Sequence, residues 1–324
     1  MADNGKLATV FGGSGFVGRY IVWSLAKRGY RVRAAVRRPD LAGHLQPMGV
    51  VGQIHAVQAN LRFADSVVRA VEGADVVINA VGILAPTGAQ SFEAVHAEGA
   101  RRVAKAAREA GAARLVHISA IGADKSSNAQ YARTKAEGEE AVLAEFPSAI
   151  ILRPSIVFGA EDQFFNRFAA LARISPGLPL IGGGRTKFQP VFVGDLGQAA
   201  ANAAIDTGNT GSIYEIGGPQ VISFRDVLEL TLRYTGRRRL LLPMPFWLAK
   251  LQALATWPLP NTLRPITVDQ VRLLKADNVV SEAAKRDGRT LEALGIAKPA
   301  AIDAIVPEYL ERFKSKGQFA SYRL

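Results

Sequence analysis

The sequence predicts an α/β fold: a doubly wound parallel sheet with a smaller C-terminal lobe. Three observations predict it. Short apolar runs alternate with amphipathic stretches through residues 1–159, and such alternation is typical of βαβ crossovers. The runs lack polar alternation, as expected for strands buried on both faces. Beyond Gly159 the alternation loosens and Gly and Pro become frequent, which indicates a second lobe.

Each element has its own signal. The strands are β-branched runs bounded by turn residues, and the helices repeat apolar residues at spacings of three and four. Ser223 is expected to cap a helix in the later part of the chain. The expected strands are residues 7–13, 31–38, 54–61, 74–82, 114–122 and 148–159, and the expected helices include residues 17–29, 62–74 and 92–112. We expect residues 1–159, joined by 188–218, to form the first domain, and residues 160–187 with 219–324 to form the smaller lobe.

Composition excludes several classes of site. The 324 residues contain no cysteine, so disulfides, thiolate metal sites and a cysteine nucleophile are excluded. The four histidines show no metal-ligand spacing, and we expect no metal. The net charge of +12 favours anionic partners, but without a basic run interleaved with aromatics we expect no nucleic acid. The first strand begins too early for a secretory segment, which favours a protein on the cytoplasmic side.

The stretch GGSGFVG joins the first strand to the first helix. It supplies Gly12, Gly15 and Gly18, and with Gly13 it matches G-x-G-x-x-G. Glycines at these positions allow a tight turn, backbone approach to a pyrophosphate and close helix packing, and the helix N-terminus favours an anion. The strand–turn–helix context favours nucleotide binding over a purely structural turn.

The second strand ends in Arg37 and Arg38. An acid there would accept hydrogen bonds from the adenosine ribose and favour NAD, whereas arginine suits the 2′-phosphate of NADP. We therefore expect NADPH. The alternative is that both arginines are merely solvated charges at the end of a strand.

Three further motifs combine with the glycine turn: NAVG at residues 79–82, Tyr131 with Lys135, and LRPSIVFG at residues 152–159. With them, residues 6 to about 200 resemble the extended or atypical short-chain dehydrogenase/reductase superfamily, which has a Rossmann-type fold. Residues four apart share a helix face, and an ammonium neighbour stabilises a phenolate. The resemblance implies that Tyr131 and Lys135 are catalytic if the site turns over, and that Lys135 holds the nicotinamide ribose. The alternative is a packing tyrosine and a solvated lysine.

The chain departs from that pattern at several positions. The fifth strand ends in Ser119 followed by Ala120, where many members carry a second hydroxyl. His96 stands where the superfamily has a helical Asn, and Asn60 stands where an adenine-contacting Asp is common. These departures affect catalysis more than binding. The full set of expected cofactor-binding residues is Gly12, Ser14, Gly15, Phe16, Val17, Gly18, Arg37, Arg38, Asn60, Leu61, Ala80, Val81, Gly82, Ser119, Tyr131, Lys135, Pro154 and Ile156.

Residues 152–172, 178–199 and 265–280 carry a closer resemblance. They resemble the NADPH-binding alpha-subcomplex accessory subunits of mitochondrial-type respiratory complex I, in their alphaproteobacterial form. The resemblance implies a tightly held, structural NADPH and other complex I subunits as partners. It also implies a peripheral location on the cytoplasmic face of the inner (plasma) membrane, on the peripheral arm near the membrane junction. The alternatives are a free NADP-dependent reductase or epimerase, and an NADPH sensor.

Residues 240–260 form an apolar segment that contains Trp247 and Trp257 and is interrupted by prolines and Lys250. It is too broken to span a bilayer. Tryptophan with flanking basic residues suits a membrane surface or a groove of a partner. A buried helix of the smaller lobe is the alternative, because periodicity does not separate these cases. The excess positive charge and the tail at residues 311–324 favour docking.

Overall fold

The computed structural model describes residues 5–206, 211–258, 264 and 266–314. Contacts divide the chain into two compact units. The first unit consists of Met1–Pro154, Val193–Ile216 and Ser281–Ala297, and the second consists of Ser155–Phe192, Gly217–Val280 and Lys298–Leu324.

The first unit is built on one sheet. Its strands are β1 (Leu7–Phe11), β2 (Arg31–Val36), β3 (Ile54–Gln58), β4 (Val76–Asn79), β5 (Arg114–Ile118), β6 (Ile150–Pro154) and β11 (Ile213–Ile216). They lie in the order β11-β6-β5-β4-β1-β2-β3, and every neighbouring pair is parallel. The predicted doubly wound parallel sheet is therefore confirmed. The order reverses between β1 and β4, and folds of this kind bind ligands at the carboxyl ends of such strands.

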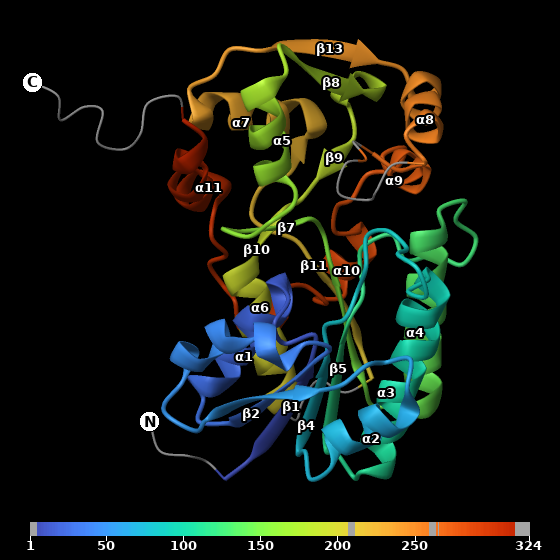
Figure 1. Ribbon diagram of the computed structural model, residues 1–324, viewed down its shortest axis with the longest axis vertical. Helices are drawn as coiled ribbons and strands as arrows, with labels where there is room; N and C mark the ends of the chain where they lie inside the picture. The colour runs from blue at the N-terminus through green and yellow to red at the C-terminus, as the bar shows by residue number, and fades with distance from the viewer. Residues whose placement is uncertain (1–4, 207–210, 259–263, 265, 315–324) are drawn as a thin grey trace, which may run out of the picture. The chain divides into compact units, whose positions relative to one another are not determined.

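Two groups of helices cover the opposite faces of this sheet (Figure 1). One group consists of α1 (Phe16–Ala26) and α6 (Val193–Ile205), and the other of α2 (Ala64–Val71), α3 (Glu98–Glu109) and α4 (Gln130–Glu145). The inner face of α3 is made mostly of alanine and valine, including Ala100, Val103, Ala104 and Ala107, all fully buried. Small side chains let α3 approach both the sheet and α4 closely. The helices on this face of the sheet are therefore tightly packed.

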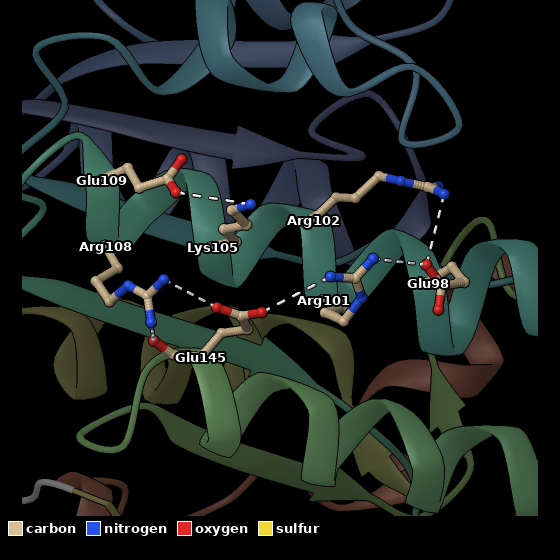
Figure 2. Close-up of polar contacts among 7 residues, drawn as sticks. All are labelled: Glu98, Arg101, Arg102, Lys105, Arg108, Glu109 and Glu145. Atoms are coloured by element: carbon tan, nitrogen blue, oxygen red, sulfur yellow. Dashed lines mark hydrogen bonds and ion pairs between the residues drawn. The ribbon is translucent and has the colours of Figure 1, made fainter.

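Ionic contacts tie the outer surface of α3 to the end of α4 (Figure 2). The carboxylate of Glu145 lies 3.1 Å from the Arg108 guanidinium and 3.7 Å from that of Arg101. Arg108 also donates to the Glu145 carbonyl at 3.2 Å. Further pairs run along α3, between Glu98 and both Arg101 and Arg102, and between Lys105 and Glu109. Glu145 thus holds two turns of α3 against the end of α4.

Two expectations about chain segments in the first unit are wrong. The strand expected at residues 148–159 ends at Pro154, because the Ser155 hydroxyl and the Ile156 N–H turn instead to Asn278 within the second unit. Residues 281–297, expected in the smaller lobe, belong to the first unit. There Ser281 N donates to the Glu215 carboxylate, and Arg289 donates to the Ile213 carbonyl. The other expected domain boundaries stay a prediction.

The second unit contains short paired strands around an aromatic core. The strands are β7 (Val157–Phe158) with β10 (Val191–Phe192), β8 (Gly177–Ile181) with β13 (Leu240–Met244), and β9 (Lys187–Phe188) with β12 (Ile222–Ser223). The helices are α5 (Phe165–Ile174), α7 (Phe224–Thr235), α8 (Phe246–Ala255), α9 (Val268–Leu273) and α11 (Ile302–Leu310), while α10 (Glu282–Arg286) lies in the first unit. Ser223 caps α7 in a capping box with Asp226, which confirms the predicted cap.

Residues 240–258 form strand β13 and helix α8, and residues 259 and 260 lie outside the described residues, as does most of the basic tail. The interpretation of this segment as a buried core helix is wrong. Helix α8 buries only Ala249 and Ala253, whereas Trp247 is 68% exposed and Leu251 and Leu254 are also exposed. Spacings of four and three place the exposed residues on one helix face. No helix among the described residues is both long and apolar enough to cross a membrane.

Candidate functional site

The glycine turn has the geometry of an anion cradle. Gly12 has a φ of +75°, in the left-handed region that favours glycine. A Cβ on Gly18 would lie 2.0 Å from the Gly12 carbonyl oxygen, so α1 reaches the turn only because residue 18 has no side chain. Gly15 caps α1 without a side-chain hydrogen bond, and the first turn carries no acid. The backbone N–H groups at the start of this helix can therefore bind an anion by donating hydrogen bonds to it.

The segment after β4 lies against this turn. A Cβ on Gly12 would lie 3.2 Å from both the Ala80 carbonyl oxygen and a methyl carbon of Val81. Asn79 shapes the segment, because its side-chain oxygen accepts from Val81 N at 3.2 Å. The structure thus brings the predicted residues Gly12, Ala80 and Val81 together, at the point where the strand order reverses.

The two arginines after β2 differ in their partners. Arg38 donates through Nε and a terminal nitrogen to both carboxylate oxygens of Asp40, at 3.0 and 2.7 Å. This pairing holds the pKa of Asp40 below its ordinary value. Arg37 is exposed, and no described acidic side chain forms an ion pair with it. Sequence reasoning overlooked Asp40, although an acid two residues from an arginine is a readable signal. Asn60 is the third residue expected at the adenosine end of the site. Its side-chain oxygen accepts a hydrogen bond from Arg62 N.

Lys135 lies deep in the first unit, only 4% exposed, and its ammonium donates to the Ile118 carbonyl at 3.0 Å. Burial lowers the pKa of Lys135 to about 8, an effect that the nearby Glu139 carboxylate opposes. Burial raises the pKa of Tyr131 to about 12, and the Lys135 ammonium lies 6.0 Å from the Tyr131 ring centroid. Burial disfavours the phenolate and makes Tyr131 a weaker acid than an ordinary phenol, and the expectation that the ammonium stabilises the phenolate stays a prediction.

The Ser119 hydroxyl is committed to a buried ion pair. Ser119 Oγ donates to a carboxylate oxygen of Glu139. The same carboxylate accepts from Arg153 Nε at 2.9 Å and from a terminal nitrogen of Arg153 at 2.5 Å. Sequence reasoning missed Glu139 and Arg153, although Tyr131, Lys135 and Glu139 follow each other at spacings of four and so share a helix face. Because the Ser119 hydroxyl donates its hydrogen bond to Glu139, it does not offer that hydrogen bond to a substrate.

Two histidines complete this end of the site. Asn79 Nδ2 donates to His117 Nδ1 at 3.1 Å, so His117 carries its proton on Nε2, which is buried without a partner among the described residues. Burial lowers the pKa of His117 to about 3 and that of His96 to about 2, helped by the Lys135 charge. Both rings are neutral at physiological pH. Pro154 ends β6, whereas Ile156, expected in the same site, belongs to the second unit.

The residues present fit a dinucleotide. The open glycine turn suits a pyrophosphate, Arg37 suits a phosphate, and the buried Lys135 suits a ribose hydroxyl. No group of three or more His, Cys, Asp or Glu side chains that could hold a metal ion occurs among the described residues. The arrangement can bind a nucleotide at its anionic and ribose groups.

Comparisons with known proteins agree with this geometry. The NAD dependent epimerase/dehydratase family matches residues 8–217. The chain is 37% identical over 292 residues to "NADH dehydrogenase [ubiquinone] 1 alpha subcomplex subunit 9, mitochondrial" of Arabidopsis thaliana, covering 87% of this chain and 72% of that protein. It is 34% identical over 319 residues to the mouse protein of that name, covering 96% and 81%. The NADPH-dependent quinone oxidoreductase of Escherichia coli, solved with NADPH, matches with a TM-score of 0.73 at 20% identity, covering 94% of this chain and 99% of that one, which shows the shared fold.

Proposed function

The chain belongs to the NAD dependent epimerase/dehydratase family and has the Rossmann-like NAD(P)-binding fold, and from this premise we propose that it holds NADPH as a structural cofactor within a respiratory NADH:ubiquinone oxidoreductase. Relatives named as alpha subcomplex subunits of NADH dehydrogenase, aligned over most of this chain, support the accessory role. The partners are then other subunits of that enzyme.

The commitment of Ser119 to Glu139 carries the proposal that the cofactor is held and not turned over. A bound NADPH supplies a hydride, but a carbonyl accepting it needs a hydrogen-bond donor and a proton. Ser119 directs its proton to Glu139, and Ala120 has no hydroxyl. Burial raises the pKa of Tyr131 to about 12, so its phenol gives up a proton less readily than an ordinary tyrosine. Lys135 and Tyr131 therefore serve as binding groups for the nicotinamide ribose.

The choice of NADPH over NADH rests on Arg37. The 2′-phosphate needs a cation beside the end of β2, and a guanidinium is the best-suited donor. Because Arg38 is paired with the Asp40 carboxylate, Arg37 makes the main contact and Arg38 a lesser one. Asn60 and Leu61 flank the adenine at this end, and the Gly12–Gly18 turn with the Ala80–Gly82 segment takes the pyrophosphate.

The location is proposed on the peripheral arm near its junction with the membrane, on the cytoplasmic face of the inner (plasma) membrane. The exposed apolar face of α8, with Trp247 and Leu251 beside the exposed Lys250, supports contact with a lipid surface. Such a mixture suits the headgroup region, where tryptophan and basic side chains are favoured.

Gentle solubilisation of native membranes, followed by sizing and nucleotide extraction, tests the proposal. We expect the chain to comigrate with a large NADH-oxidising assembly and to retain about one NADPH per chain. A free chain that exchanges its nucleotide readily and reduces carbonyls would instead favour the alternative, an NADP-dependent reductase. In that case Tyr131→Phe would abolish the activity while leaving nucleotide binding largely intact, because it removes only the proton donor.

A further inference from the structure

His96 lies in an irregular turn beside the site, and the proposed function gives it no role. It belongs to the π-helical turn η3 (Glu93–Ala97), which leads directly into α3. Turns of this kind are rare and frequently occur at functional sites. The His96 ring is buried, stacked beside Phe92 and edge-on to Tyr131, with both ring centroids 5.3 Å away.

The hydrogen bonds of His96 fix its tautomer. Ile83 N–H donates to Nε2 at 3.1 Å, so Nε2 carries the lone pair. Nδ1 then carries the proton and contacts Thr134 Oγ1 at 3.1 Å, while the Thr134 hydroxyl donates onward to the Gln130 carbonyl at 2.9 Å. Each contact in this chain therefore has a defined direction, with Thr134 Oγ1 accepting from Nδ1 and donating to the Gln130 carbonyl. His96 thus joins the segment after β4 to helix α4.

Both ends of this bridge lie beside the groups that face the nucleotide. A Cβ on Gly82 would lie 3.5 Å from the Lys135 ammonium nitrogen and 3.9 Å from His96 Nε2. On the α4 side, a Cβ on Gly138 would lie 2.1 Å from the His96 carbonyl oxygen, so the π-helical turn rests directly on the helix that carries Tyr131 and Lys135. A shift of the segment at Ile83 would change the space beside the ammonium.

We propose that His96 is a positioning residue: as a neutral imidazole it latches the Ala80–Ile83 segment to α4 and so retains the nicotinamide end of the bound dinucleotide. This deepens the proposed function and rests on it for the identity of the ligand. The latch itself rests on the contacts of His96 with Ile83 and Thr134. Because an acceptor at the position of Nε2 holds the Ile83 N–H, the role depends on that atom and not on the ring alone.

Three substitutions separate these contributions. His96→Gln places an acceptor as many bonds from Cβ as Nε2, His96→Asn places polar atoms only at the position of Nδ1, and His96→Phe keeps the ring without an acceptor. The first readout is amide hydrogen exchange of Ile83 in nucleotide-free protein. The second is the rate at which bound NADPH, or NADH if the wild type retains that instead, is lost on dilution into excess unlabelled nucleotide.

We expect the Phe and Asn variants to raise the exchange of Ile83 and the rate of nucleotide loss by about tenfold each, the effect of one lost hydrogen bond, and the Gln variant to restore both. Thr134→Val, which removes only the partner of Nδ1, should raise both by a smaller factor and serves if the His96 variants fold poorly. The matched control is Thr235→Val in the second unit, where a buried hydroxyl donates within its own helix.

If Ile83 in the Phe variant exchanged its amide hydrogen at the wild-type rate, the proposed bridge through His96 would be contradicted. A Gln variant that behaves like the Asn variant would contradict it as well. Faster exchange with an unchanged rate of nucleotide loss would overturn the role in retention. A wild-type protein that binds neither nucleotide would contradict the proposed function, yet the exchange of Ile83 would still decide whether His96 latches the segment.

Discussion

Replacing Lys135 with Met should stabilise the nucleotide-free protein. Lys135 is buried, and its pKa falls from the ordinary value of 10.5 to about 8. At 1.36 kcal/mol per pKa unit, keeping this ammonium charged in the folded state costs about 3 kcal/mol. Met fills a similar volume without a charge, but Lys135→Met also removes the hydrogen bond to the Ile118 carbonyl, worth about 1 kcal/mol. The expected net gain near pH 7 is about 2 kcal/mol.

The pH dependence distinguishes this reasoning from a simple packing effect. Below pH 8 the lysine is protonated in both the folded and the unfolded states, so the full cost is present. Between pH 8 and pH 10.5 the folded state has released the proton and the unfolded state still holds it. The unfolded state then binds more protons, and the stability of the wild type rises with pH. The advantage of the Met variant should therefore shrink across this range.

Urea unfolding of both proteins at several pH values from 7 to 10 measures the difference. Lys105→Met is the matched control, because Lys105 lies on α3 with its side chain 50% exposed, and its effect should be small and independent of pH. An advantage that stays constant with pH, or a Met variant less stable than the wild type at pH 7, would refute the reasoning. The same variant should bind nucleotide more weakly, since a residue retained for binding at the expense of stability is expected at a functional site.

Three further outcomes are expected. Arg37→Ala should raise the NADPH dissociation constant by about 10- to 100-fold, the value of a charge-assisted contact, and leave NADH affinity unchanged. Arg38→Ala should have a smaller effect in the same titration. Equal affinities of the wild type for both nucleotides would contradict the role of Arg37. Glu145→Gln should lower the free energy of unfolding by about 1 kcal/mol, since two partly exposed ion pairs are lost, and the loss should shrink at high salt in urea titrations; a loss insensitive to salt would point to packing. Trp247→Ser should reduce sedimentation with vesicles of anionic lipid by about tenfold, the effect of withdrawing one large apolar side chain. The control Leu41→Ser in the first unit should leave sedimentation unchanged. Equal binding by both variants would contradict a contribution of α8 to lipid binding.

The fold of the first unit could be predicted from sequence because its signals are local. Each strand is an apolar run, each helix has its own periodicity, and right-handed crossovers leave few ways to connect them. The glycine turn was predictable for the same reason, since Gly12 and Gly18 are required by a backbone conformation and a close approach that short-range sequence reports. The capping box of Ser223 is equally local.

The division of the later chain was less predictable. Residues 281–297 join the first unit through contacts with Glu215 and Ile213, more than 60 residues away in the chain. Nothing within the segment itself signals those partners. The exposed face of α8 was also undecided, because an apolar helix has the same pattern whether its tryptophan, Trp247, is buried or exposed.

By itself the sequence determined which residues could bind a dinucleotide: a glycine turn after the first strand, arginines after the second, and Tyr131 with Lys135 on one helix. Only the tertiary structure decided what those groups can do. The Ser119 hydroxyl donates to Glu139, burial makes Tyr131 a weaker acid, and His96 joins Ile83 to Thr134. The physical reason is that hydrogen-bond partners and desolvation are set by side chains from different elements, and their meeting depends on how the helices pack on the sheet.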